Sequence, residues 1–294
     1  MLYGAFLGDM IGVPFEFLPC TIRNFPIFTP YTRYSDDSVM TMAIAEAMIM
    51  THGYSEEEAL PVIVEQMQKY GKKYPGAGYG AGFGGWIYQK DPKPYGSWGN
   101  GSAMRVSSVG WFYDTLEETE ERAKWTAEVT HNHPEGIKGA QATASAIFLA
   151  RTGHSKKEIK DYIEKKYGYD LSRTCKQIKQ SGYGFSEMCQ KTVPESIICF
   201  LEGKDFEDVI RNAVFLNGDA DTMACIAGAI AEAFWGGVPE GWITECTSRL
   251  PQDFLDTIKR SEDYVAHKSQ IVPPAPKSTK VPKFLLKHFG GTSQ

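Results

Sequence analysis

The sequence predicts an all-α protein. Three capping boxes precede apolar patterns, at Ser55-x-x-Glu58, Asp114-x-x-Glu117 and Ser155-x-x-Glu158. Apolar residues also recur three and four positions apart in several further stretches, as on the buried face of a helix. Runs of alternating β-branched residues, which would indicate strands, are almost absent.

These signals place the helices and leave two segments outside the pattern. The predicted helices cover 38–50, 55–70, 114–129, 138–150, 155–167 and 205–216. The segment 74–105 is rich in Gly and aromatic residues and too long for a plain connector, so it is either a mobile surface loop or a loop that embraces a ligand. The segment 268–294 is rich in Pro and Lys and is interpreted as a C-terminal tail. We therefore expect one compact domain over 1–267.

Composition narrows the class of protein. The net charge of −5 and the scattered basic residues disfavour nucleic acid as a partner. The six cysteines include no C-x-x-C pair, so we expect reduced thiols in a cytoplasmic protein. The apolar N-terminal stretch lacks a basic region and contains Asp9 and Glu16, which argues against an export signal. No apolar run is long enough to span a membrane. We expect no membrane contact, and a monomer.

Two acids and a threonine stand where a helix of small residues begins, in NGDADTMACIAGAIAEAFWGG (217–237). Within a continuous helix, Asp219 and Asp221 would point about 200° apart, because each residue turns the chain by about 100°. They converge only if the chain is still entering the helix there. The cluster of Asp219, Asp221 and Thr222 is therefore either an ordinary helix cap or part of a ligand site.

A second cluster of the same kind, Ser35, Asp36 and Asp37, opens another small-residue helix in YSDDSVMTMAIAEA. If both helix starts meet, their four carboxylates balance two divalent ions, and the Ser and Thr hydroxyls add neutral oxygen ligands. Oxygen-only ligation suits Mg²⁺ or Mn²⁺ better than Zn²⁺. We expect the two acid-bearing helices to approach closely through small residues of the second, namely Ala224, Ala227, Gly228 and Ala231.

Five motifs together resemble a known family. They are, in order, GAFLGDMIGVPFEF, SDDSVM, GNGSAMR, THNHPEGIKGAQATA and NGDADTMACIAGAIAEAFWG. From about residue 4 to 237 the chain is similar to the ADP-ribosylglycohydrolases, the group that includes dinitrogenase reductase-activating glycohydrolase. The resemblance implies an all-α, orthogonally packed multi-helix bundle with a binuclear Mg²⁺ or Mn²⁺ centre. It also implies that this centre removes ADP-ribose from modified side chains or related acceptors.

The resemblance assigns metal ligands. They fall on Ser35, Asp36, Asp37, Asp219, Asp221 and Thr222. Ser35 stands where the family more often has Thr, and Asn217-Gly218 replaces a frequent Gly-Gly. The resemblance also places Glu16 near the metals, whereas Asp9 is expected to brace a helix.

The resemblance assigns substrate contacts as well. The segment SWGNG (97–101) matches the part of the family that holds the diphosphate and the distal ribose, which implies contacts at Ser97, Gly99, Asn100 and Gly101. His131 corresponds to a histidine that helps to hold ADP-ribose in some relatives. From the residues alone, a histidine in THNHP is also an ordinary structural residue.

The expected chemistry is hydrolysis at C1 of the ribose. We expect the ribose 2- and 3-hydroxyls to dock at the two metals, a water near the metals to attack C1, and Glu16 or Asp37 to handle the proton. The sequence does not choose between these two acids. The substrate would be an ADP-ribosylated protein, with arginine as the acceptor, or an ADP-ribosyl small molecule.

Other functions stay open at this point. A hydrolase of another N- or O-ribosyl small molecule or nucleic-acid adduct would keep the same metal site. A non-catalytic ADP-ribose-binding homologue is also consistent with the motifs, although a binder has little need for a charge-balanced dimetal site. A metal-dependent phosphatase fits the acids, but the GNGSAMR segment disfavours it.

Overall fold

Residues 1–268 are described by a computed structural model of the chain. In these residues helices are joined by loops, no strand forms, and the only β-type pairing is an isolated bridge between Gly99 and Met188. The all-α class is confirmed. The elements are α1 (Tyr3–Gly12), the 3₁₀ helix η1 (Val13–Phe15), α2 (Asp36–Met50), α3 (Glu56–Lys73), α4 (Ala81–Ile87), α5 (Gly101–Met104), α6 (Ser107–Phe112), α7 (Leu116–Glu128), α8 (Pro134–Arg151), α9 (Lys156–Tyr167), α10 (Cys175–Gln180), α11 (Cys189–Glu202), α12 (Phe206–Phe215), α13 (Ala220–Trp235), α14 (Glu240–Arg249) and α15 (Gln252–His267).

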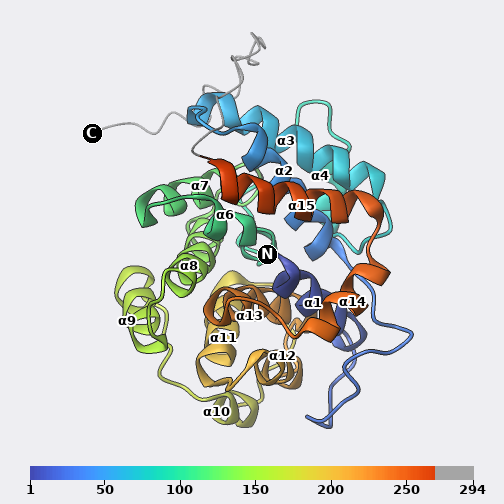
Figure 1. The fold of residues 1–294 in the computed structure, drawn as a ribbon, viewed down its shortest axis with the longest axis vertical. Coiled ribbons are helices and arrows are strands. Elements are labelled where there is room, and N and C mark those ends of the chain that lie inside the picture. The colour runs from blue at the N-terminus through green and yellow to red at the C-terminus, as the bar shows by residue number, and fades with distance from the viewer. Residues whose placement is uncertain (269–294) are drawn as a thin grey trace.

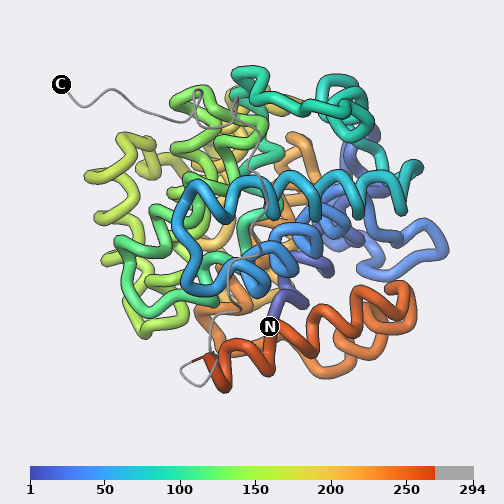
Figure 2. The backbone as a smooth tube through the Cα atoms, turned by 90° about the horizontal axis from the view of Figure 1, so that it is seen from above, coloured from blue at the N-terminus to red at the C-terminus, as the bar shows by residue number. Residues whose placement is uncertain are grey.

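Helix α13 is the centre of the bundle. It packs against α1, α8, α11 and α12, and its residues from Ala220 to Ala233 are buried. In Figure 1, α1 lies beside α13, while α2, α3 and α15 form the upper part of the molecule. Figure 2 shows the segment 74–105 (cyan to teal) at the edge of the molecule. Because small apolar residues predominate in α13, its neighbours approach it closely.

The predicted helices form, with shifted ends and one wrong cap. Ser55 and Ser155 each form the predicted capping box. The box predicted at Asp114 does not form. Thr115 is the capping residue instead, and its hydroxyl accepts a hydrogen bond from the backbone N–H of Glu118 at 3.2 Å. Helix α7 therefore begins at Leu116, and Asp114 lies outside it.

The segment 74–105 is more ordered than a mobile surface loop. It contains α4 and α5, and Trp86 within α4 is fully buried. The ring of Trp86 stacks on Phe83 with centroids 5.4 Å apart, and its indole N–H donates to the carbonyl of Lys93 at 3.1 Å. This aromatic anchor fixes the central part of the segment against the core.

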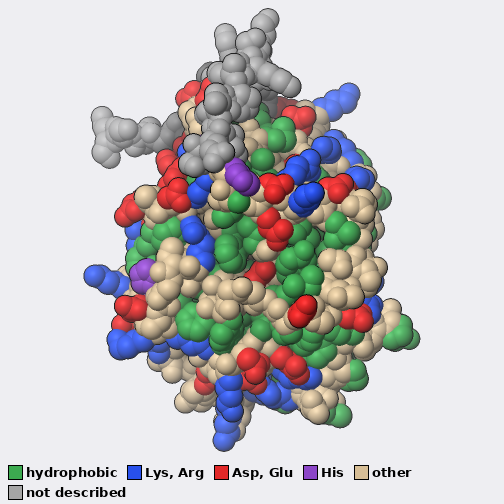
Figure 3. Space-filling view, viewed as in Figure 1, with side chains coloured by type: hydrophobic (Ala, Val, Ile, Leu, Met, Phe, Trp, Pro, Cys, Tyr) green, Lys and Arg blue, Asp and Glu red, His purple; other side chains and the backbone are tan. Residues whose placement is uncertain are grey.

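The described part of the chain has a face of mixed charge (Figure 3), no helix suited to cross a bilayer, and no disulfide. On the face that Figure 3 shows, basic and acidic side chains are intermixed. None of the described helices combines the length and apolar character needed to cross a bilayer. The six cysteines all lie in the described part of the chain, and none forms a disulfide. Except for Lys268, the tail expected over 268–294 lies outside the described residues.

Candidate functional site

The site begins where α1 packs against α13. A Cβ added to Gly8 would lie 2.0 Å from the carbonyl oxygen of Ala224, and one added to Gly12 would lie 2.3 Å from the Cα of Asp221. The two backbones are therefore in contact, which only glycine permits. The expectation that small residues of α13 pack against the other acid-bearing helix is wrong, since they pack mainly on α1, and α2 meets α13 at its N-terminus.

Asp9 joins α1 to the start of α2. Its carboxylate accepts hydrogen bonds from the backbone N–H of Ser35 at 2.9 Å and of Ser38 at 3.0 Å, and from both serine hydroxyls. Asp9 is fully buried, and burial raises the pKa of its carboxyl even though these hydrogen bonds act in the opposite direction. The expected bracing role of Asp9 is confirmed. The brace holds the first turn of α2 against α1.

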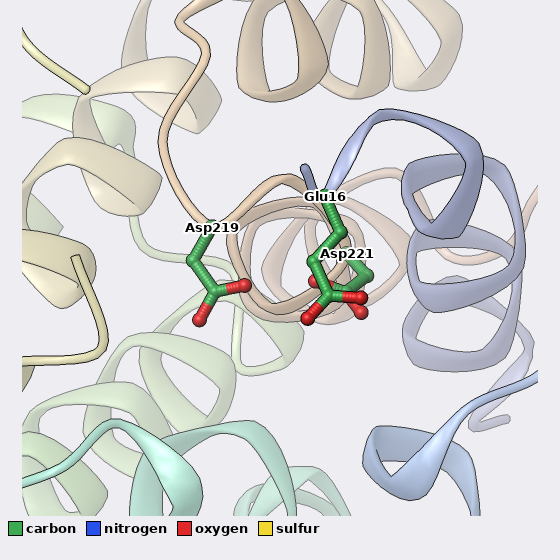
Figure 4. A group of neighbouring side chains, drawn as sticks. All are labelled: Glu16, Asp219 and Asp221. Carbon is green, nitrogen blue, oxygen red and sulfur yellow. The ribbon is translucent and has the colours of Figure 1, made fainter. Parts of the chain in front are cut away.

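Three carboxylates from two segments converge beside this brace. Glu16, just after η1, and Asp219 and Asp221 at the start of α13 each place an oxygen within 4.8 Å of the others. Figure 4 shows the carboxylates of Glu16 and Asp221 lying together, with that of Asp219 on the same side. Asp219 occupies the capping position of α13, yet its side chain makes no capping hydrogen bond. The interpretation of Asp219 as an ordinary cap does not fit this geometry.

The second cluster lies beside the first. The hydroxyl of Thr222 donates to Asp37 at 3.2 Å, which joins the first turns of α13 and α2. Asp36 and Asp37 line the same cavity as Glu16 and the first turn of α13, and its volume is about 470 Å³. Ser35 is the exception among the six predicted ligands. Its hydroxyl donates to Asp9 at 2.6 Å and accepts from the N–H of Asp37, and Ser35 does not line the cavity.

The carboxylates of the cavity raise one another's pKa. Burial, followed by the charge of Asp221, raises the pKa of Asp36 and Asp37 well above the usual range. Burial and the same charge raise the pKa of Glu16 to about 7. Burial raises the pKa of Asp219 to about 6, against the hydrogen bonds it accepts. Buried like charges of this kind are stable only with a compensating cation or with protons.

The donor set fits hard divalent cations. Among the described residues, no Lys or Arg forms an ion pair with these five acids, although the charge of Arg33 slightly opposes the rise in the pKa of Glu16. Oδ1 of Asp37 is buried without a hydrogen-bond partner. The available ligand atoms are carboxylate and hydroxyl oxygens, which Mg²⁺ and Mn²⁺ prefer. The residues that could hold the ions are Asp36, Asp37, Asp219, Asp221 and Thr222, with Glu16 adjacent.

The predicted substrate residues line the other side of the same cavity. They are Ser97, Gly99, Asn100, Gly101 and His131. Residues at and just before the start of α11 hold the 97–101 segment in place. The N–H of Asn100 donates to the carbonyl of Glu187 at 2.7 Å, and the N–H of Cys189 donates to the carbonyl of Trp98 at 3.0 Å. The long segment 74–105 thus supplies much of the cavity wall, as the ligand-embracing interpretation requires.

Asn100 connects the two sides. Its side-chain amide donates to Asp219 at 2.7 Å and to the hydroxyl of Thr192 at 3.2 Å. The sequence motif marked Asn100 as a substrate contact but did not indicate this link to the acidic cluster. The hydrogen bond fixes the carboxylate of Asp219 relative to the 97–101 segment.

Several cavity residues were not predicted as site residues, among them three that carry charge or an exposed ring. Arg105 is buried at the end of the GNGSAMR motif, while Phe17 and Glu187 lie exposed at the rim. The motif contained the signal for Arg105, because a charged residue directly after a short apolar helix must find polar partners when buried. No local pattern marks Glu187, which reaches the cavity through the bridge between Gly99 and Met188.

Comparisons with known proteins agree on one family. The family model for ADP-ribosylglycohydrolases matches residues 1–270. ADP-ribosylhydrolase ARH3 of Homo sapiens is 26% identical over 331 residues, covering 86% of this chain and 90% of that protein. ADP-ribosylarginine hydrolase Tri1 of Pseudomonas putida is 23% identical over 292 residues, covering 87% of this chain and 76% of that protein.

A solved structure shares the fold. It is described as an ADP-ribosylglycohydrolase-related protein complex, with a TM-score of 0.66 and 22% sequence identity, and the match covers 90% of this chain and 93% of that one. At this level of identity the likeness shows the arrangement of helices. The orthogonal multi-helix bundle expected from the sequence motifs is thereby confirmed.

Proposed function

The chain belongs to the ADP-ribosylglycohydrolase family, and on that premise we propose that it is a hydrolase, dependent on Mg²⁺ or Mn²⁺, that releases ADP-ribose from modified arginine side chains. The observation that carries the proposal is the single cavity lined by both acidic clusters and by the 97–101 segment. Five carboxylates that form no ion pair within the described chain line this cavity together with the 97–101 segment, and the amide of Asn100 in that segment donates to Asp219. Such a cavity suits cations on one side and a polar, anionic substrate on the other.

The reaction would replace the bond from C1 of the ribose to nitrogen with a bond from C1 to the oxygen of water. Divalent ions held by the two clusters would supply Lewis acidity that orients the ribose hydroxyls and lowers the pKa of water. Glu16 is the better placed of the two candidate acids, because it lies half-buried on a turn at the cavity, whereas Asp37 is buried in a helix and accepts from Thr222.

In this reaction Glu16 would transfer one proton from the attacking water to the leaving group. A carboxylate oxygen of Glu16 would accept the proton lost by the attacking water and pass it to the guanidine nitrogen as the C1–N bond breaks. The products are ADP-ribose and a guanidinium, so no net proton is consumed. Burial keeps the pKa of Glu16 at about 7 before any cation binds, and a cation would lower it toward the carboxylate form needed here.

The cavity rim supports arginine as the acceptor. Glu187 is exposed there, and its side chain forms no ion pair within the described residues. Phe17 and Phe185, exposed by 74% and 46%, face each other beside it with ring centroids 5.4 Å apart. A guanidinium can pair with a carboxylate and stack on aromatic faces. The relative Tri1 is named for ADP-ribosylarginine.

A release assay tests the proposal. Purified protein with Mg²⁺ is incubated with arginine-linked, serine-linked and polymeric ADP-ribose, and free ADP-ribose is measured. We expect arginine-linked ADP-ribose to be cleaved fastest. Release from none of the three would contradict the hydrolase assignment, and preferential release from serine or from the polymer would contradict the acceptor.

A rim variant tests the acceptor separately. Glu187→Gln is expected to raise KM for the arginine-linked substrate roughly threefold, the size of one exposed ion pair, and to leave a serine-linked substrate unchanged. Glu57→Gln, an exposed glutamate in the first turn of α3, is the matched control. An equal effect of Glu187→Gln on both substrates would remove Glu187 from acceptor recognition.

A further inference from the structure

We propose that Arg105 and Thr130 are positioning residues that hold His131 with its proton on Nε2, so that the ring donates a hydrogen bond into the cavity. The inference rests on the proposed function only for the ligand, an oxygen of ADP-ribose, of which the diphosphate oxygens are the strongest acceptors. The arrangement of the three side chains stands independently of it. All three are buried, with exposed fractions of 1%, 0% and 5%.

The three side chains form a chain of hydrogen bonds. Nη2 of Arg105 donates to the carbonyl of Thr126 at 2.7 Å and to the hydroxyl oxygen of Thr130 at 2.9 Å. That same hydroxyl lies 2.7 Å from Nδ1 of His131. Thr130 follows the last turn of α7, so its backbone position is set by that helix rather than by the cavity.

The number of protons on these side chains fixes which group donates and which accepts in each hydrogen bond. A guanidinium has only donors, so the oxygen of Thr130 must accept from Arg105. The hydroxyl has a single proton, and its partners within the described residues are Arg105 and His131. A buried hydroxyl proton left unpaired is costly, so this proton points to Nδ1 of His131. Nδ1 then offers a lone pair, and a neutral imidazole carries its proton on Nε2.

The surroundings keep the imidazole neutral. Burial, and then the positive charge of Arg105, lower the pKa of His131 well below its usual range. The other titratable group facing the ring is Tyr95, with ring centroids 6.0 Å apart, and burial raises the pKa of its phenol, so it stays uncharged. No carboxylate forms an ion pair with His131 or Arg105 in the described chain.

The free nitrogen of His131 faces the substrate wall. Nε2 has no hydrogen-bond partner among the described residues, and His131 lines the cavity. A Cβ added to Gly101 would lie 3.0 Å from Nε2, and one added to Gly99 would lie 3.6 Å from it. The nitrogen thus sits beside the 97–101 segment, where a ligand oxygen would meet an N–H donor.

Arg105 also favours an anionic ligand group at the end of the cavity near His131. It lines the cavity, it has no carboxylate partner within the described residues, and its Nε is buried without a hydrogen-bond partner. The cavity is therefore positive near Arg105 and negative near the two acidic helix starts. A ligand with a diphosphate next to a ribose matches that order of charge.

The position of the proton is measured directly. Protein labelled with ¹⁵N-histidine is saturated with Mg²⁺, and two-bond ¹H–¹⁵N correlations report which ring nitrogen is protonated. Comparison with His131→Gln assigns the signals. We expect protonated Nε2 and unprotonated Nδ1 from pH 6 to pH 8. A proton on Nδ1, or an imidazolium at pH 7, would overturn the proposal.

The binding consequence is measured by calorimetry with free ADP-ribose and Mg²⁺. Thr130→Val removes the hydroxyl at nearly constant shape and is expected to weaken ADP-ribose binding about tenfold, while Thr130→Ser retains wild-type affinity. Thr143→Val is the matched control, because Thr143 is buried and its hydroxyl has no partner in the described chain. Equal affinity of Thr130→Val and wild type would overturn the positioning role.

The two proposals fail in different ways. If the wild-type protein binds no ADP-ribose, the proposed function fails, and the ¹⁵N spectrum still decides the proton position. If ADP-ribose binds but Nδ1 carries the proton, only the present inference fails. If Thr130→Val does not fold, the ¹⁵N spectrum of the wild type still decides the position of the proton.

Discussion

The hydroxyl of Thr222 lies 3.2 Å from a carboxylate oxygen of Asp37, although the two residues are 185 positions apart in the chain. The contact brings the N-terminal turns of α13 and α2 together. Helix N-termini carry partial positive charge, which offsets part of the repulsion between the acids there. The remaining charge is what the proposed cations would balance.

Gly8→Ala tests whether helix packing sets the site. The added Cβ would lie 2.0 Å from the carbonyl oxygen of Ala224, so α1 and α13 must separate. We expect the free energy of unfolding in urea to fall by about 1–3 kcal/mol or more, as for an overpacked core, together with weaker Mg²⁺ binding. Gly241→Ala in α14 meets nothing within 4 Å and is the control. A Gly8→Ala protein as stable as wild type would contradict the packing.

Glu16→Gln tests the proton-transfer role. The change keeps the side chain's size and removes its ability to accept a proton, so kcat for ADP-ribose release should fall about 10²–10⁴-fold. Mg²⁺ affinity and ADP-ribose binding should change far less. An unchanged kcat at saturating Mg²⁺ would leave Glu16 only a structural or gating role.

The acidic cluster should make the metal-free protein less stable as pH rises. The pKa of Glu16 is raised from 4.5 to about 7, and that of Asp219 from 3.8 to about 6, so the folded state holds more protons than the unfolded state between these values. Stability from these groups is complete below about pH 4 and is lost as pH rises through 6 to 7.

Urea unfolding in EDTA at pH 5.5 and pH 8 measures this loss. We expect a lower unfolding free energy at pH 8, a smaller difference in Glu16→Gln, and a larger gain from Mg²⁺ at pH 8, because cations bind deprotonated carboxylates. The same gain from Mg²⁺ at both pH values would count against the cluster as the metal site.

Local patterns in the sequence predicted six of the helices and the two acidic clusters, whereas Glu16, the 97–101 segment and His131 were assigned through the family resemblance. Capping boxes and apolar spacing found α2, α3, α7, α8, α9 and α12, since both signals depend on residues close in the chain. They did not find α11 and α15, of 14 and 16 residues. At Asp114 the same signal was wrong, because Thr115 competes for the capping position and its hydroxyl reaches Glu118. Helix starts are decided by such neighbouring polar groups, which the four-residue capping pattern does not distinguish.

Among contacts between distant segments, the sequence suggested only the meeting of the two acid-bearing helix starts. The packing partner of α13 was assigned to α2, whereas the glycines of α1 meet it, since small residues show that a close approach occurs but not with which helix. The bond from Asn100 to Asp219 and the chain from Arg105 to His131 likewise join residues with no sequence periodicity between them. Only the folded chain brings them together.

The central claim is that the two helix starts form one dimetal centre, and a titration of metal-stripped protein with Mn²⁺, followed by the electron paramagnetic resonance signal of the free ion, tests it most directly. We expect two bound Mn²⁺ per wild-type chain. Asp36→Asn and Asp219→Asn should each lose binding while the fold is retained, because Asn caps a helix about as well as Asp but carries no charge. Full Mn²⁺ binding by either variant, or no binding by the wild type, would contradict the account.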